Sequence, residues 1–116
     1  MPVDKKLVES RGFQISRLYS GGPYRLAPVV DSYGEPLDVS RAGFANIQKG
    51  KRELGESPKE WYSHAKDPNY SGVLQLIAIS NTLEWAVDES MNWLSSRGYG
   101  MEQDVFTGKI GPARYE

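Results

Sequence analysis

Hydrophobic and polar positions alternate in two short stretches near the start of the chain, residues 13–19 and 24–30. Such alternation is typical of strands with one buried face. The Gly-Gly-Pro run at residues 21–23 suits a turn, because glycine permits positive φ and proline fixes φ. We therefore predict an antiparallel hairpin. Pro28 has no amide hydrogen, so we expect the second strand to lie at an edge of the sheet or to be bulged there.

The spacing of apolar residues then changes and favours a helix. Val39, Ala42, Phe44 and Ile47 would share one helical face. Gly50 is well placed to cap the C-terminus of this helix, because glycine adopts the left-handed conformation that helix ends require.

A second helix is predicted to begin after Ser57. The Ser57 side chain can cap the helix, Pro58 suits the first helical position, and Glu60 completes a capping box. This helix would carry Trp61. It must end before Pro68, because the residue before a proline is disfavoured in helical conformation.

Residues 73–79 are nearly all apolar, and they fit either a buried strand or the first turns of a long helix. A new capping pattern follows at residues 81–84. After it, apolar residues recur at spacings of four, four and three: Leu83, Val87, Met91 and Leu94. This pattern predicts an amphipathic helix that ends near Gly98.

These elements predict one α+β domain over residues 1–116, in which a small sheet built on the N-terminal antiparallel β-hairpin packs against a single layer of two to three helices. We expect residues 1–11 to be frayed or to form a short helical turn, and the tail around Val105, Phe106 and Ile110 to add one short strand. The predicted core residues are Phe13, Ile15, Leu18, Leu26, Val29, Phe44, Ile47, Trp61, Leu74, Leu76, Ile77, Leu83, Val87, Met91 and Leu94.

Composition narrows the classes of protein. The absence of cysteine excludes disulfides, thiolate metal sites and a cysteine nucleophile, and it favours a cytoplasmic location. No apolar run approaches the roughly 20 residues that span a bilayer, so we expect no membrane partner. Residues 1–52 carry nine Lys and Arg against five acids, whereas residues 53–116 carry five against ten. This asymmetry predicts either an anionic partner for the first half or attraction between the two halves.

The segment 39–52 resembles the recognition-helix segment of phage-repressor-type helix-turn-helix domains. Such segments begin with Val-Ser and place apolar residues at the fifth and eighth positions after the Val, followed by Gly and two basic residues, as do Phe44, Ile47 and the end of this segment. The side chains that the resemblance assigns to base edges are Ser40, Arg41, Asn46 and Gln48. Those assigned to phosphates are Lys49, Lys51 and Arg52. The alternative is an amphipathic helix whose last turn gathers cations at its carbonyl end.

His64 is the single histidine of the chain. A general base could be built from His64 with Glu60, and a metal site could add Asp67. No second histidine or spaced acid cluster supports either site, and the alternative is a surface or boundary residue near the end of a short helix. We therefore predict no catalytic residues, no metal, no cofactor and no enzymatic activity.

The last predicted helix has features of a protein-binding surface. Trp85 and Trp93 are offset from its apolar stripe, so at least one should be exposed, and Trp is favoured at interfaces. The acids Glu84, Asp88 and Glu89 lie beside them and form either a contact for a basic partner or a solvated face, and the first two could pair for acid–base chemistry. The leading hypothesis is a small binding protein that contacts another protein, as inhibitors, adaptors and regulatory accessory proteins of phages and mobile elements do. DNA binding by the basic segment is the alternative, and the oligomeric state stays open.

Overall fold

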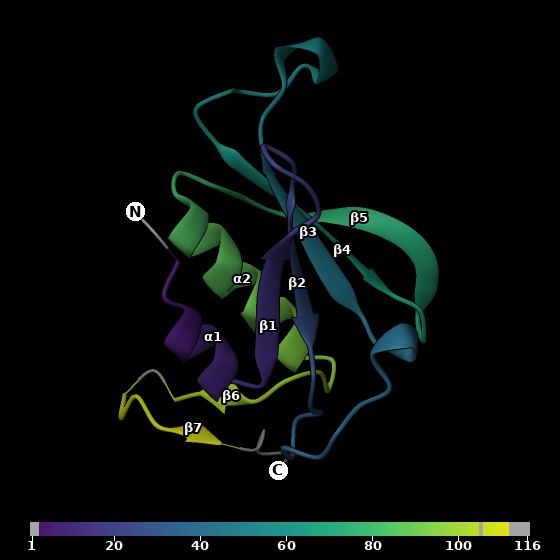
Figure 1. Ribbon diagram of the computed structural model, residues 1–116, viewed down its shortest axis with the longest axis vertical. Helices are drawn as coiled ribbons and strands as arrows, with labels where there is room; N and C mark the ends of the chain where they lie inside the picture. The colour runs from purple at the N-terminus through teal and green to yellow at the C-terminus, as the bar shows by residue number, and fades with distance from the viewer. Residues whose placement is uncertain (1–2, 105, 112–116) are drawn as a thin grey trace.

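The computed structural model describes residues 3–104 and 106–111, and its main element is a five-stranded antiparallel sheet (Figure 1). Each strand pairs with the strand that precedes it in the chain, which gives the spatial order β1-β2-β3-β4-β5. The strands are β1 (Phe13–Arg17), β2 (Tyr24–Pro28), β3 (Phe44–Lys49), β4 (Trp61–Asp67) and β5 (Ser71–Ser80). The two edges of the sheet are therefore β1 and β5.

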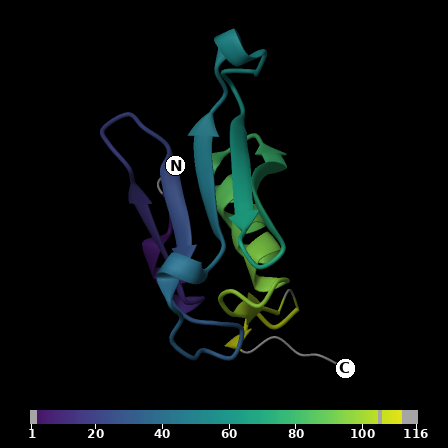
Figure 2. The ribbon, with the colours of Figure 1, turned by 90° about the vertical axis from the view of Figure 1, so that its right-hand side faces the viewer.

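Two α-helices cover one face of this sheet. Helix α2 (Leu83–Ser95) crosses β2 to β5, and helix α1 (Lys5–Ser10) lies beside α2 next to β1. Figure 2 shows the strands in front and α2 behind them. Two short 3₁₀ turns, Val39–Arg41 and Arg52–Leu54, flank β3. A small separate pair of strands, β6 (Glu102–Gln103) and β7 (Ile110–Gly111), lies near the C-terminal end.

The hydrophobic core fills the space between α2 and the sheet. The predicted amphipathic stripe of α2 is confirmed, since Leu83, Val87, Met91 and Leu94 are all buried. Thr82 caps this helix by accepting a hydrogen bond from the Trp85 N–H at 3.1 Å. The sheet contributes buried side chains from β1 to β4, namely Phe13, Leu26, Ala45, Ile47 and Ala65.

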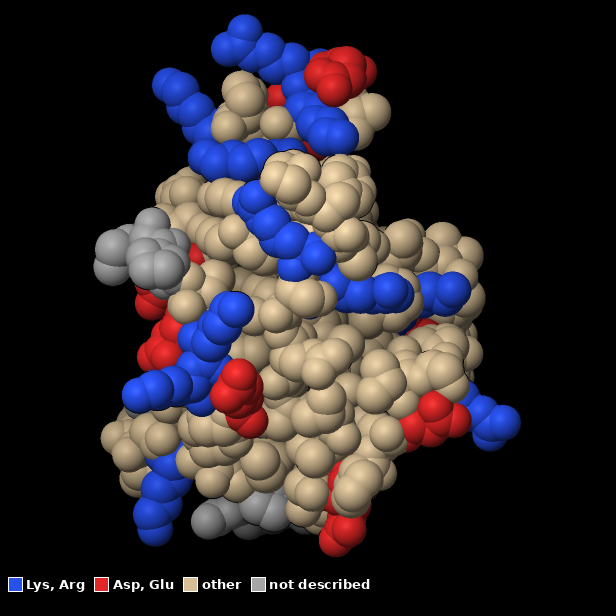
Figure 3. All heavy atoms as spheres, viewed as in Figure 1, with Lys and Arg blue, Asp and Glu red and all other residues tan. Residues whose placement is uncertain are grey.

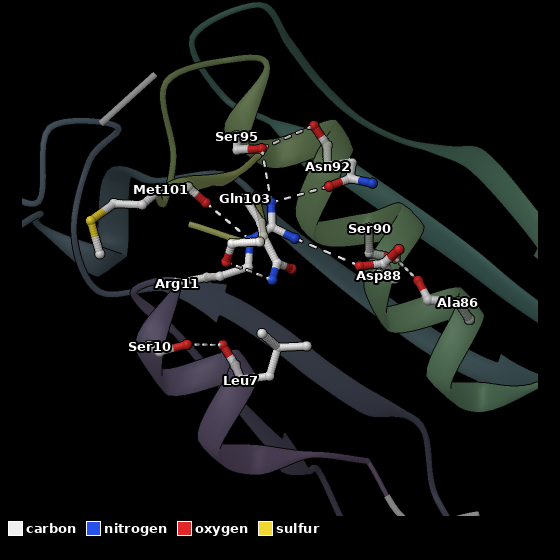
Figure 4. A network of polar contacts seen from close by, with 11 residues as sticks. Leu7, Ser10, Arg11, Ala86, Asp88, Ser90, Asn92, Ser95, Met101 and Gln103 are labelled. Carbon is white, nitrogen blue, oxygen red and sulfur yellow. Dashed lines mark hydrogen bonds and ion pairs between the residues drawn. The ribbon is translucent and has the colours of Figure 1, made fainter. Parts of the chain in front are cut away.

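A buried arginine connects α1, α2 and the segment after α2 (Figure 4). Arg11 is 1% exposed, and its Nε donates a hydrogen bond to the Met101 carbonyl oxygen at 3.1 Å. Its Nη2 donates to Asn92 Oδ1 at 3.1 Å. Its Nη1 lies 3.7 Å from Asp88 Oδ1, whose side chain is half exposed. Burial lowers the pKa of Arg11, and the charge of Asp88 opposes that shift.

The predicted fold class is wrong, because the molecule is mostly sheet with one long helix rather than a hairpin against a layer of helices. The hairpin itself is present as β1 and β2. Residues 39–50, however, form a 3₁₀ turn and then β3, in which alternate residues such as Ala45 and Ile47 point into the core. Gly50 is no helix cap: a Cβ there would lie 2.0 Å from the Ser57 carbonyl oxygen, so glycine permits a close backbone approach.

The helix predicted after Ser57 is also absent, and Trp61–Asp67 forms β4 instead. Ser57 begins a tight turn in which its carbonyl oxygen accepts from the Glu60 N–H at 3.1 Å. The residues that follow it include Trp61 and Tyr62, which favour strands, and pairing with β3 on one side and β5 on the other outweighs the capping signal. The run at 73–79, left open between strand and helix, is strand and belongs to β5.

Most of the predicted core is buried or half-buried, but Leu18, Leu74 and Leu76 are exposed. The last two lie on β5, an edge strand whose outward face no helix covers. Neither alternative predicted for the strand that carries Pro28 is found, because β2 lies between β1 and β3 and its register with β1 runs without a bulge. Pro28 is tolerated since the pairing with β3 reaches only from Tyr24 to Leu26.

The two ends of the chain agree in part with the prediction. The helical turn expected within residues 1–11 is present as α1. In the tail, Ile110 lies in β7, whereas Phe106 is exposed in the turn between β6 and β7. Val105 lies outside the described residues.

Candidate functional site

The face of the sheet opposite α2, here called the open face, carries polar and cationic side chains. Side chains of directly paired residues lie on the same face of a sheet, so the register identifies its members. They are Gln14, Ser16, Arg25, Ala27, Phe44, Asn46, Gln48, Tyr62, His64, Lys66, Leu76 and Ile79. None of these twelve positions holds Asp or Glu, so the open face attracts anions.

A hollow of about 470 Å³ opens over β2 and β3 on this face. Here the guanidinium carbon of Arg25 lies 4.0 Å from the centre of the Phe44 ring, and Lys66 pairs directly with Phe44 across to β4. The other lining residues include Gln14 and Ser40, and no carboxylate lines the hollow. Cation and aromatic ring thus lie together on an accessible wall, an arrangement suited to a planar anionic ligand.

Asn46 lies at the centre of the open face, between Arg25 of β2 and His64 of β4. Its Oδ1 atom is buried and has no hydrogen-bond partner among the described residues. Buried polar atoms are normally paired, so this acceptor is available to a donor from water or from a ligand.

A second hollow, of about 190 Å³, lies at the end of the sheet between the β1–β2 turn and the segment that follows β3. Its lining includes three cations, two aromatic rings and no carboxylate: Arg17, Lys49, Lys51, Tyr19 and Trp61. The Lys49 ammonium lies 5.3 Å from the Trp61 ring centre. Gln48 lines this hollow and also lies on the open face, whereas Lys49 and Trp61 point to the other face of the sheet, so the hollow borders the open face at the end of β3. This end of the sheet is at the top of Figure 3, which shows Lys and Arg gathered there together with some acidic residues at the tip.

The residues assigned to DNA recognition do not share a helix, because none forms over 39–52. Arg41 is exposed and lies 3.6 Å from Asp38, and the Ser40 hydroxyl donates to the same carboxylate at 2.6 Å. Asn46 and Gln48 lie together on the open face. The phosphate-binding candidates divide differently: Lys49 points to the opposite face of β3, while Lys51 and Arg52 are exposed in the β3–β4 connection.

Three of the five residues proposed for protein contact line one groove between α1 and α2. This groove, of about 330 Å³, includes Glu84, Trp85 and Asp88. Its floor is apolar, and Asp4 lines it as well. Two of the acids have partners within the chain, since Asp4 caps α1 and Asp88 pairs with Arg11.

The other two residues proposed for protein contact lie outside that groove. Trp93 is half-buried against the core, with the Arg97 guanidinium carbon 3.7 Å from its ring centre. Glu89 is exposed on α2. The expectation that at least one tryptophan is exposed is confirmed by Trp85, which is 64% exposed.

The possible catalytic or metal set around His64 is not assembled. His64 is half-buried on the open face, whereas Asp67 is buried and accepts a hydrogen bond from the Tyr99 hydroxyl at 2.7 Å. Glu60 precedes β4 in the tight turn. Within residues 3–104 and 106–111, no group of three or more His, Asp or Glu side chains could hold a metal ion.

Sequence reasoning missed the residues that give the open face its character, namely Arg25, Phe44 and Lys66. In the first segment, residues 44–49, the alternation of polar and apolar residues was the available signal, since it separates an outward polar face from an inward apolar one. Residues 61–67 carry no such alternation, because Ser63 and Asp67 are buried polar residues. The spacing of apolar residues in the first segment fitted a helix equally well, which hid that alternation.

No protein-family model, curated protein or solved structure matches this chain. In the part of the chain that the structure describes, no helix is long and apolar enough to cross a membrane.

Proposed function

We propose that this chain is a binding protein that acts by macromolecular contact, and that its partner is a single-stranded nucleic acid held on the open face and in the hollow at the end of the sheet. The observation that carries the proposal is the composition of the two hollows. Each places Lys or Arg beside an aromatic ring and holds no carboxylate.

The chemistry of a single strand matches these two hollows. Phosphates require cations, and unstacked bases require aromatic or guanidinium planes, such as Phe44 and Arg25. The hollows meet the two ends of β3, which spans about 17 Å from Phe44 to Lys49. The unpaired oxygen of Asn46 lies between them and can accept a hydrogen bond from a base edge.

A single strand fits better than duplex DNA. Reading a major groove commonly uses a helix or a two-stranded ribbon that carries basic residues. The long helix of this molecule instead carries Glu84, Asp88 and Glu89, and the cations lie on and beside a broad sheet. Half-buried aromatic side chains on a sheet can reach bases only where the bases are not already stacked in a duplex.

The second candidate is a protein partner in the groove between α1 and α2. It is favoured by the exposed Trp85 ring beside an apolar floor and three acids. A partner segment with apolar and basic side chains would complement this groove.

The test measures binding of labelled single strands of about 16 nucleotides, and of the matching duplex, between about 50 and 200 mM salt. Two double variants each remove a pair of cations: Arg25→Gln with Lys66→Gln, and Lys49→Gln with Lys51→Gln. The matched control is Lys5→Gln with Lys6→Gln, which makes the same charge change on exposed residues of α1.

We expect each test variant to bind the single strand more weakly and to lower the slope of log affinity against log salt by about 1.4, because each phosphate contact contributes about 0.7. The control should keep the wild-type slope. No binding at the lowest salt, a preference for the duplex, or an equal loss in the control would each contradict the proposal.

A further inference from the structure

The hollow at the end of the sheet, here called the end hollow, gathers three cations that have no acidic partner. Arg17, Lys49 and Lys51 all line it, and no carboxylate does. Among the described residues, no Asp or Glu lies within ion-pair distance of any of these three side chains. Because like charges around one hollow repel each other, an anion that enters it is attracted by all three.

The acids of the connection between β3 and β4 lie outside the end hollow. They are Glu53, Glu56 and Glu60, and none of them lines it. The Glu56 carboxylate accepts a hydrogen bond from the Lys51 backbone N–H at 3.0 Å but forms no ion pair with the Lys51 ammonium group. The lining of the end hollow therefore carries positive charge alone.

The size and the place of the end hollow suit the end of a strand. Its volume of about 190 Å³ is below the range of roughly 300–1,000 Å³ that is typical of small-molecule pockets, so it has room for a small anionic group. The path along the open face also ends here, because beyond Gln48 the lining side chains Lys49 and Trp61 point to the other face. Trp61 is half-buried against the core and forms the inner wall of the hollow.

We propose, on the basis of the function proposed above, that the end hollow binds a terminal phosphate of the single strand. A phosphomonoester carries about 1.5 to 2 negative charges at pH 7, whereas an internal phosphodiester carries about one. The three cations therefore favour a terminal phosphate over an internal one. The nucleotides that follow the terminal phosphate then lie along β3 on the open face, toward Arg25 and Phe44.

The test compares single strands of about 16 nucleotides that share one sequence and differ only at their ends. Each carries a 5′-phosphate, a 3′-phosphate, or the methyl ester of one of these phosphates. The methyl ester is almost as large as the phosphate but lacks its second charge. We expect the phosphate at one end to bind about fivefold more tightly than its methyl ester, because one further exposed ion pair contributes at most about this factor. The end that shows the gain gives the direction of the bound strand.

Two double variants locate this gain. Lys49→Gln with Lys51→Gln removes two of the three cations of the end hollow and should remove most of the gain. Arg25→Gln with Lys66→Gln removes two cations from the hollow over β2 and β3, so it should weaken the phosphate and the methyl ester equally and keep the gain. The single variant Lys51→Gln changes an exposed residue outside the strands and should lower the gain without disturbing the fold.

The outcomes separate this inference from the proposed function. Equal binding of phosphate and methyl ester at both ends overturns the inference and leaves the proposed function standing, because the single strand is still bound. An equal gain at both ends, or a gain that survives Lys49→Gln with Lys51→Gln, shows that the end hollow does not select the terminal phosphate and overturns the inference too. No binding of any form at about 50 mM salt overturns the inference together with the proposed function.

Discussion

Replacing the buried arginine tests what holds the two helices and the segment after α2 together. Arg11→Met keeps a similar length and removes the charge and every donor. The variant loses the two hydrogen bonds of 3.1 Å, to the Met101 carbonyl oxygen and to Asn92 Oδ1, and a longer one of 3.4 Å to Ser95 Oγ. The Met101 carbonyl oxygen then lacks its charged donor. Asn92 is exposed, so its side-chain amide can form a hydrogen bond with water instead.

The magnitude follows from these contacts. A hydrogen bond from a charged donor contributes about 1.5–3 kcal/mol. Removing the guanidinium also relieves the cost of burying its charge, which offsets part of the loss. We therefore expect the free energy of unfolding to fall by about 2–3 kcal/mol. At about 4 °C per kcal/mol for a chain of this size, Tm should fall by about 10 °C.

The assay is urea unfolding followed by tryptophan fluorescence, with Asp88→Asn as the control. The Asp88 carboxylate is half exposed and 3.7 Å from Arg11, so removing its charge should cost less than about 1 kcal/mol. Equal destabilisation of the two variants would contradict this expectation, since the ion pair would then dominate. A change of less than about 0.5 kcal/mol in the stability of Arg11→Met would contradict it as well.

Two further predictions concern Tyr99 and the tryptophans of α2. Burial, and then its hydrogen bond to Asp67, raise the pKa of Tyr99, so the folded state keeps a proton that the unfolded chain loses above about pH 10. The advantage of the wild type over Tyr99→Phe in urea unfolding should therefore be full at pH 8 and shrink above about pH 10, and a constant difference would contradict this. Trp85→Ala should change the free energy of unfolding by less than about 0.5 kcal/mol, whereas Trp93→Ala should cost about 2 kcal/mol or more. An equal loss of stability in both variants would contradict the prediction that the exposed Trp85 contributes less to stability than the half-buried Trp93.

The sequence is sufficient to predict α2 because several signals agree there. The apolar stripe, the capping Thr82 and the glycine at residue 98 all indicate the same helix. The hairpin of β1 and β2 is predictable for the same reason, since alternation and a glycine turn coincide.

The strands β3 and β4 could not be predicted, because local signals there compete with pairing between strands. Phe44 and Ile47 are three residues apart, which fits one face of a helix, yet in β3 they lie on opposite faces of the sheet. The capping box at Ser57 is a real local pattern, but it serves a turn. Hydrogen bonds to two neighbouring strands decide the outcome, and a single sequence does not reveal which segments will become neighbours.

The candidate site was likewise predictable in part, from local features but not from the pairing of strands. Its cationic character was visible in the charge of the first half of the chain, and Asn46, Gln48 and Lys49 were identified from a helical resemblance that the fold does not bear out. The pairing of Arg25 with Phe44 joins two strands whose order only the fold reveals.

The order of the strands also bears on how the molecule folds. Because every strand pairs with its neighbour in the chain, the sheet can grow one hairpin at a time, and each step closes only the connection between two successive strands. The contact between Arg11 and Met101 is different, since 90 residues separate its two ends. Closing a loop of that length directly would cost more entropy than closing any one hairpin, so we expect the contact to form late, after the sheet and α2 have brought its two ends together.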